Sequence, residues 1–171
     1  MLSSQSREER DRKSRLIQKK LFGAAAFQSA GTICFYVALP VEVDMHPMID
    51  ASLKMGKKVL VPLVDLENKE IKLKEIRDFQ KDLAPGMLGI PEPKPGTRDA
   101  DAGEVGCIIV PALAFDAKGY RLGRGGGFYD RFLSNLSPKV VTIGLAFSFQ
   151  VFPQIPLEVH DRAVDIVLTE K

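Results

Sequence analysis

The amino-acid sequence predicts an α/β fold: a single three-layer αβα domain with a mostly parallel central sheet. Short apolar, β-branched runs alternate with amphipathic segments along the chain. A strand, a helix and a second strand fit within residues 32–64, which is the size of a βαβ unit. Runs that are apolar at every position are typical of strands covered on both faces. With 171 residues, the chain fits one domain that spans residues 1–171.

The first part of the chain supplies the predicted βαβ unit. Residues 6–27 carry apolar side chains at near-helical spacing, which predicts an amphipathic helix. Residues 32–38 and 58–64 are continuous apolar runs, and we expect two buried strands there. Between the strands, Asp44 is expected to cap a helix that Gly56 ends.

The later segments continue the alternation of strands and helices. Residues 70–76 alternate apolar and charged side chains, which predicts a half-exposed edge strand. Residues 84–106 are rich in Pro, Gly and charge, so we expect a long surface loop there. Residues 107–115 form another buried run. The remaining predicted elements are a helix at 127–136 and strands at 140–147 and 164–169.

Composition narrows the function classes. Hydrophobic residues make up 45% of the chain, charged residues 27%, and the net charge is +2. The most basic segment, residues 7–20, also contains acidic side chains, so we expect no nucleic-acid partner. No apolar run is long enough to span a membrane and no secretory leader is evident, which predicts a cytoplasmic protein. Cys34 and Cys107 lie in apolar segments and are expected to be buried, reduced thiols.

Glycines gather in one stretch, "GYRLGRGGGFYD", at residues 119–130. Gly123 and Gly125–Gly127 follow a buried strand and open a helix, where backbone N–H groups converge and the helix dipole favours an anion. Arg121 and Arg124 can add planar donors to phosphate oxygens. The spacing fits neither the Walker nor the dinucleotide pattern. The stretch therefore predicts a phosphate loop of another kind, and the structural alternative is a mobile turn with two solvated arginines.

Asp130 lies in the first turn of the helix that follows. Its carboxylate can cap that helix, or it can meet phosphates through Mg²⁺, which binds few carboxylates and bridges phosphate oxygens. The sequence leaves both interpretations open. Asp161 and Asp165 could supply a second carboxylate. The two histidines, His46 and His160, are expected to be structural.

Several motifs together resemble one known family. "VPALAFDAKGYRLGRGGGFYDRFL", "YVALPVEVDMHPMI", "GKKVLVP", "GIPEP", "IGLAFSFQ" and "HDRAVDIVLTEK" resemble the 5-formyltetrahydrofolate cyclo-ligase family in order and spacing, from Ser3 onward. The resemblance implies ATP-dependent cyclisation of 5-formyltetrahydrofolate to 5,10-methenyltetrahydrofolate, with release of ADP and phosphate. An iminium phosphate is the implied intermediate. It further implies a protein that is a monomer or a weak homo-oligomer.

The same resemblance implies the roles of individual residues. The implied catalytic residues are Arg124 and Asp130. The implied ATP contacts are Arg121, Leu122, Gly123, Arg124, Gly125, Gly126, Gly127, Phe128 and Tyr129. The implied folate contacts are Val37, Glu42, Arg124, Gly125, Gly126, Gly127 and Phe128. The implied magnesium ligands are Asp130 and Asp161.

The sequence departs from the family pattern at three points. It is expected to lack the family's first Lys-x-x-x-Arg helix, which reaches the nucleotide. Phe128 stands where the family often has tyrosine, and Gly126 where some relatives have lysine. The rival hypothesis is therefore a folate- or nucleotide-binding protein of the same fold that has lost turnover. A third hypothesis, an isomerase-like or acyl-transfer enzyme, rests on architecture alone.

Overall fold

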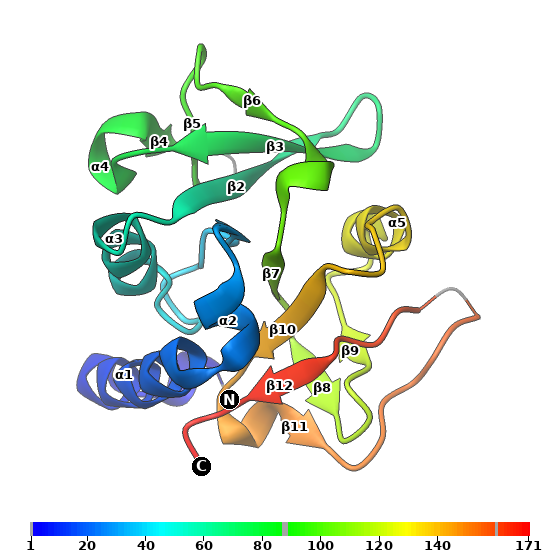
Figure 1. Ribbon diagram of the computed structural model, residues 1–171. Coiled ribbons are helices and arrows are strands. Elements are labelled where there is room, and N and C mark those ends of the chain that lie inside the picture. The colour runs from blue at the N-terminus through cyan, green and yellow to red at the C-terminus, as the bar shows by residue number, and fades with distance from the viewer. Residues whose placement is uncertain (1, 87–88, 160) are drawn as a thin grey trace.

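A seven-stranded sheet forms the centre of the molecule (Figure 1). The computed structural model describes residues 2–86, 89–159 and 161–171. The strands of this sheet are β1 (Thr32–Cys34), β2 (Lys58–Asp65), β3 (Glu70–Ile76), β6 (Asp99–Ala100), β7 (Cys107–Val110), β10 (Val141–Leu145) and β12 (Ile166–Leu168). Their order is β12-β10-β7-β1-β2-β3-β6. The first five strands in this order run parallel, and β3 pairs antiparallel with β2 and with β6.

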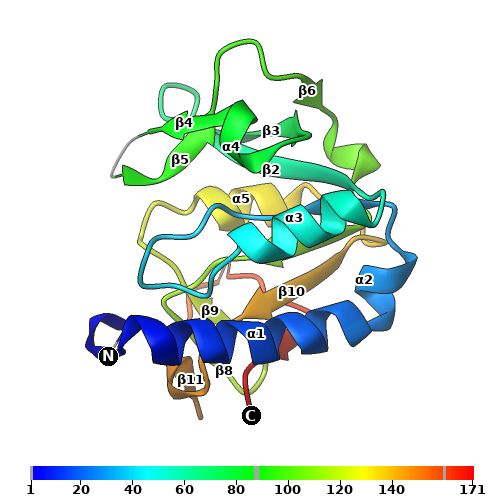
Figure 2. The ribbon, with the colours of Figure 1, turned by 90° about the vertical axis from the view of Figure 1, so that its left-hand side faces the viewer.

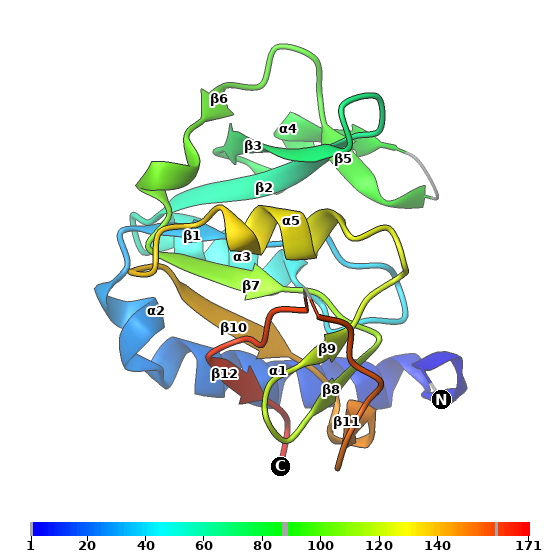
Figure 3. The same cartoon turned by 90° about the vertical axis from the view of Figure 1, so that its right-hand side faces the viewer.

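Helices cover both faces of the sheet. The helices are α1 (Arg7–Gly23), α2 (Ala25–Ser29), α3 (His46–Lys54), α4 (Phe79–Asp82) and α5 (Phe128–Ser134), with short 3₁₀ turns η1 (Leu2–Ser4), η3 (Ala102–Glu104) and η4 (Ser148–Gln150). Figure 2 shows α1, α2 and α3 over one face, and Figure 3 shows α5 over the other. The expected three-layer α/β architecture is confirmed.

Two small sheets extend this framework. One has the order β11-β8-β9 and is built from β8 (Ala114–Asp116), β9 (Arg121–Leu122) and β11 (Val151–Phe152). The other pairs β4 (Leu83–Pro85) with β5 (Pro91–Pro93). No helix in the described part of the chain has the length and apolar character of a membrane span.

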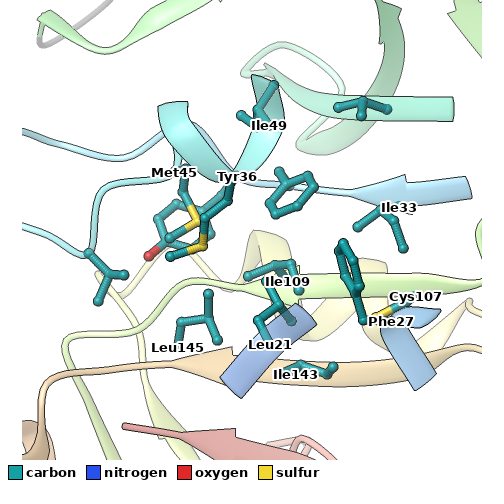
Figure 4. Packing of buried hydrophobic residues seen from close by; sticks show 14 of the residues in the cluster. Leu21, Phe27, Ile33, Tyr36, Met45, Ile49, Cys107, Ile109, Ile143 and Leu145 are labelled. Atoms are coloured by element: carbon teal, nitrogen blue, oxygen red, sulfur yellow. The ribbon is translucent and has the colours of Figure 1, made fainter. Parts of the chain in front are cut away.

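Successive residues of the buried strands point into two separate cores. Val59 and Val61 of β2 pack with the helices α1 to α3, whereas Leu60 faces the α5 side. Figure 4 shows Leu21 of α1 and Ile109 of β7 within the first core. A strand between two cores needs apolar side chains at odd and even positions, which explains the continuous apolar runs in the sequence.

Both cysteines are buried and free, as expected. Cys107 belongs to the core beneath α1 to α3, and Cys34 to the core beneath α5. Burial raises the pKa of each thiol to about 12. His46 stacks on the ring of Phe79 with centroids 4.0 Å apart, which fits a structural role. His160 lies outside the described residues.

The structure corrects several predicted elements. The expected loop at 84–106 contains most of β4, all of β5 and β6, and the turn η3. The strand at 70–76 is not an edge strand, because β6 pairs with its outer side. The predicted strand at 107–115 is divided between β7 in the main sheet and β8 in a small one. The first predicted helix is interrupted at Ala24, whose backbone is extended.

The helix α3 has nearly the expected ends. Asp44 accepts a hydrogen bond from the backbone N–H of His46 at 3.1 Å, although the N-cap position itself falls on Met45. Gly56 follows the helix with a φ of 76°, in the left-handed region that glycine adopts most readily. The carboxylate therefore supports the first turn from one residue further out than expected.

Candidate active site

A cavity of about 620 Å³ lies where the carboxyl ends of the parallel strands meet. Its wall includes Tyr36 and Val37, which follow β1, and Pro111–Leu113, which follow β7. Ligands in open α/β sheets commonly bind at this edge. All the site residues implied in the sequence analysis line this one cavity: Val37, Glu42, Arg121, Leu122, Gly123, Arg124, Gly125, Gly126, Gly127, Phe128, Tyr129, Asp130 and Asp161.

Asp165 is the candidate carboxylate that the structure places elsewhere. One carboxylate oxygen, Oδ2, accepts hydrogen bonds from the backbone N–H of Thr142 at 2.8 Å and from its hydroxyl at 2.7 Å. These bonds tie the chain before β12 to β10. Asp165 therefore stabilises the sheet edge and does not contribute to the cavity wall.

Two features of the glycine loop, residues 123–127, require glycine. Gly125 and Gly127 have φ values of 86° and 64°, which strain any residue with a Cβ. A Cβ on Gly126 would lie 2.7 Å from the ring of Phe128, and one on Gly127 would lie 2.9 Å from Nη1 of Arg131. The loop and these two side chains therefore pack as one unit at the start of α5.

Arg121 and Asp130 form the most buried ion pair of the site. Nη2 of Arg121 lies 2.6 Å from Oδ1 of Asp130, and the two side chains are 3% and 22% exposed. The guanidinium also lies over the ring of Tyr129, 5.8 Å from its centroid. Burial lowers the pKa of Arg121, while the charges of Asp130 and Asp161 act in the opposite direction. The nearby carboxylates thus favour the charged guanidinium inside the protein.

A second ion pair links the glycine loop to the segment after β1. Nη2 of Arg124 donates to Oε1 of Glu42 at 3.0 Å, and Oε2 of Glu42 accepts from the backbone N–H of Leu39 at 2.9 Å. The Glu42 side chain is 11% exposed and that of Arg124 is 56% exposed. The Glu42 carboxylate is therefore held by the backbone of its own segment, whereas the exposed Arg124 can leave Glu42 and bind a ligand.

Asp130 and Asp161 line the same cavity, and both carboxylates act on the charge of Arg121. Oδ2 of Asp161 accepts from the backbone N–H of Glu158 at 2.7 Å, which fixes the carboxylate in its turn. Within the described ranges, no group of three His, Cys, Asp or Glu side chains has the arrangement of a metal site. Two carboxylates fit a Mg²⁺ ion that takes its other ligands from phosphate and water.

Sequence reasoning missed several parts of the cavity wall, among them Tyr36, Pro111–Leu113 and Arg131. Burial raises the pKa of Tyr36, which looks like an ordinary core residue in its apolar run. Pro111–Leu113 were expected to continue a strand. Arg131 is exposed and also lines the cavity, next to Asp130. The sequence signal for Arg131 is Gly127, because a Cβ there would lie 2.9 Å from Nη1 of Arg131.

Comparison with known proteins shows to which class of enzyme the protein belongs. The NMR structure of Aquifex aeolicus 5,10-methenyltetrahydrofolate synthetase is 36% identical, with a TM-score of 0.83 over 98% of this chain and 82% of that one. A 5,10-methenyltetrahydrofolate synthetase from Mycoplasma pneumoniae has the same fold, with a TM-score of 0.80 and 23% identity over 99% of this chain and 92% of that one. A 5-formyltetrahydrofolate cyclo-ligase from Mus musculus is 32% identical over 99% of this chain and 88% of its own length. The protein is an α/β enzyme of the ligase class.

The family model gives the more specific assignment. The model of the 5-formyltetrahydrofolate cyclo-ligase family matches residues 1–170. A 5-formyltetrahydrofolate cyclo-ligase from Mycolicibacterium smegmatis is 36% identical over 84% of this chain and 75% of its own length. The chain belongs to the 5-formyltetrahydrofolate cyclo-ligase family, which confirms the resemblance found in the sequence.

Proposed function

We propose that the protein closes 5-formyltetrahydrofolate to 5,10-methenyltetrahydrofolate while ATP is converted to ADP and phosphate. One observation carries the proposal: a single cavity presents the glycine loop with its arginines, two aspartates, and the Glu42 carboxylate. A nucleotide and a second substrate can therefore meet within one site. The names of the relatives support the same reaction.

The proposed chemistry explains why a phosphate loop is needed. Ring closure joins N10 to the formyl carbon and must expel the formyl oxygen, which is a poor leaving group as hydroxide. Transfer of the γ-phosphoryl group to that oxygen gives an N5-iminium phosphate. N10 then attacks the activated carbon, the C–O bond breaks, and phosphate leaves with the oxygen while N10 loses its proton. Phosphoryl transfer of this kind depends mainly on positioning and charge stabilisation.

The described residues can supply both requirements. Arg124 is exposed on the glycine loop, so it can turn from Glu42 to the phosphate chain. Arg121 brings a fixed positive charge to the cavity, held in place by Asp130. Glu42 can then accept hydrogen bonds from the donor-rich edge of the pterin, and Val37 can form an apolar wall beside it. Arg124 and Asp130 are the proposed catalytic residues.

Asp130 and Asp161 are the proposed ligands of Mg²⁺, which supplies neutralisation of phosphate charge when it is bound. The cytoplasm is the proposed location, since two free thiols suit a reducing compartment. We further propose that the protein acts as a monomer or weak homo-oligomer without a nucleic-acid partner.

A direct assay tests the reaction. The purified protein is incubated with ATP, Mg²⁺ and 5-formyltetrahydrofolate, and the methenyl product is followed by absorbance while ADP is measured separately. We expect equal amounts of both products, and no methenyl product with a non-hydrolysable ATP analogue. A protein that has lost turnover would show a thermal shift with both ligands and no product. Product formation without ATP would favour another class of enzyme.

A further inference from the structure

Arg131 is held on the cavity wall by three contacts. Its Nη2 donates to the carbonyl oxygen of Gly126 at 3.2 Å, and its Nε donates to the carbonyl oxygen of Lys69 at 3.3 Å. Its guanidinium lies 5.1 Å from the centroid of the Phe128 ring. Arg131 is exposed to solvent, and these three contacts orient its guanidinium beside the cavity that it lines.

Arg131 differs from the other two arginines of the site in the partners of its guanidinium. Arg121 pairs with Asp130, and Arg124 pairs with Glu42. Across residues 2–86, 89–159 and 161–171, the acceptors of Arg131 are backbone carbonyls and no carboxylate forms an ion pair with it. A guanidinium has five N–H groups, so several remain for a ligand after these two bonds. The group is suited to an anion, and best to a carboxylate or phosphate bound by two hydrogen bonds.

Arg131 and Asp130 reach opposite sides of α5. Asp130 contacts Arg121 in β9, whereas Arg131 contacts the turn between β2 and β3. Figures 1 and 3 show that turn and β9 on opposite sides of the helix. The proposed magnesium and phosphate groups lie with Asp130, so Arg131 serves a different part of the cavity.

The wall on the β2 side contains four apolar residues and one acidic residue. Pro62 and Val64 of β2 line it together with Ile90, Pro91 and Glu92. The folate substrate has a flat aminobenzoyl ring that ends in a glutamyl group with carboxylates. The apolar residues of this wall can pack against the aminobenzoyl ring. The Arg131 guanidinium beside them can then reach the glutamyl carboxylates, which follow the ring in the molecule.

We propose that Arg131 binds a glutamyl carboxylate of the folate substrate. The inference rests on the proposed function and adds a substrate-binding residue to it. The pterin then lies toward Glu42, and the carboxylate toward the β2–β3 turn. Arg131 acts in substrate affinity and takes no part in the phosphoryl transfer.

The test combines a change in the protein with a change in the substrate. Arg131→Gln, Arg131→Lys and the wild type are assayed with 5-formyltetrahydrofolate and with 5-formyltetrahydropteroate, which lacks the glutamyl group. Arg12→Gln is the matched control, since it removes an exposed arginine from α1. For Arg131→Gln we expect the KM for the folate to rise roughly 10- to 100-fold, as for a lost charge-assisted hydrogen-bonded pair, with little change in kcat. Arg131→Lys should recover part of the loss.

The pteroate separates binding from a structural role. Wild type and Arg131→Gln should have the same KM for the pteroate and the same KM for ATP. An equal rise in KM for both folate substrates would mean that Arg131 acts only by supporting the glycine loop. A raised KM for ATP would mean that Arg131 binds the nucleotide phosphates. Either result overturns the inference. If the wild type forms no methenyl product, the proposed function fails, and calorimetric binding of the two folates to both proteins decides the role of Arg131 separately.

Discussion

At the scale of the residue, the two arginines of the glycine stretch differ in burial, and we expect them to contribute differently to stability. The Arg121 side chain is 3% exposed and pairs with Asp130, whereas that of Arg124 is 56% exposed and pairs with Glu42. Removing one partner of a buried pair leaves an uncompensated charge in a poorly solvated place. Arg124 itself is exposed, and the Glu42 carboxylate that its removal leaves, 11% exposed, keeps the hydrogen bond from the backbone N–H of Leu39. The two residues can therefore be separated by stability as well as by activity.

The first prediction compares Arg121→Gln with Arg124→Gln. Arg121→Gln should lower the free energy of unfolding by about 1–3 kcal/mol, because Asp130 loses its buried partner. Arg124→Gln should change it by less than about 1 kcal/mol. Urea denaturation followed by circular dichroism measures both values. Equal losses would show that the difference in burial does not decide stability here.

The second prediction concerns Asp130 and uses Asp165 as the matched control. Asp130→Asn should reduce turnover by about 100-fold or more, because the proposed stabilisation of phosphate charge is lost. Asp165→Asn should retain turnover, since Asp165 bonds to Thr142 outside the cavity. Steady-state assays across a range of Mg²⁺ concentrations provide the measurement. Wild-type turnover in Asp130→Asn would limit Asp130 to its contact with Arg121.

At the scale of the element, the sequence predicted strands with continuous apolar runs and missed the short strands in the segment rich in Pro, Gly and charge. The strand predicted at 58–64 is β2, and the one predicted at 32–38 is β1, which ends at Cys34, earlier than expected. Both were recognisable because packing on two faces leaves a continuous apolar pattern. The strands β4, β5 and β6 are two or three residues long and lie in a segment rich in Pro, Gly and charge, so that segment was predicted to be a loop. Pro111 ends β7 and separates it from β8, although the apolar run continues across both.

The site was predictable where its residues are neighbours in the sequence. Glycines and arginines at 121–130 form a recognisable local pattern, and they share one cavity. The contact between Glu42 and Arg124 joins positions 82 residues apart, and only the fold creates it. The pairing of Arg121 with Asp130 depends on the angle between β9 and α5, which no residue pattern encodes.

The third prediction tests how β10 packs against the small sheet. A Cβ on Gly144 would lie 2.4 Å from the ring of Phe115, which is fully buried in β8. Gly144→Ala should therefore cost about 1–3 kcal/mol of stability. The control, Gly31→Ala, has open space around the new methyl group and should change stability by less than about 1 kcal/mol. Similar unfolding curves for the two variants would contradict the packing argument.

At the scale of the whole molecule, the sheet divides the interior into two cores, and each core holds one cysteine. Burial raises the pKa of Cys34 and of Cys107 to about 12, above the value near 8.5 of an unfolded thiol. The folded state therefore retains the thiol protons over a range in which the unfolded state loses them. This contribution to stability is complete below about pH 8.5 and is lost as the pH rises toward 12.

The fourth prediction follows from the protonation and burial of both thiols. At pH 8 a thiol-specific reagent should modify neither cysteine at a measurable rate in the folded protein, because the reactive thiolate is suppressed and covered. Both cysteines should react together as urea unfolds the chain, with the midpoint given by circular dichroism. Fast modification of one cysteine under native conditions would show that one core opens independently of the other.

The cavity is assembled from segments that leave the ribosome at very different times. Its wall begins with Tyr36 and ends with Asp161, and β12 follows only at residues 166–168. A nascent chain therefore carries every residue of the cavity wall only after Asp161 has been added. Ligands of the site can stabilise the fold only when nearly the whole chain has emerged.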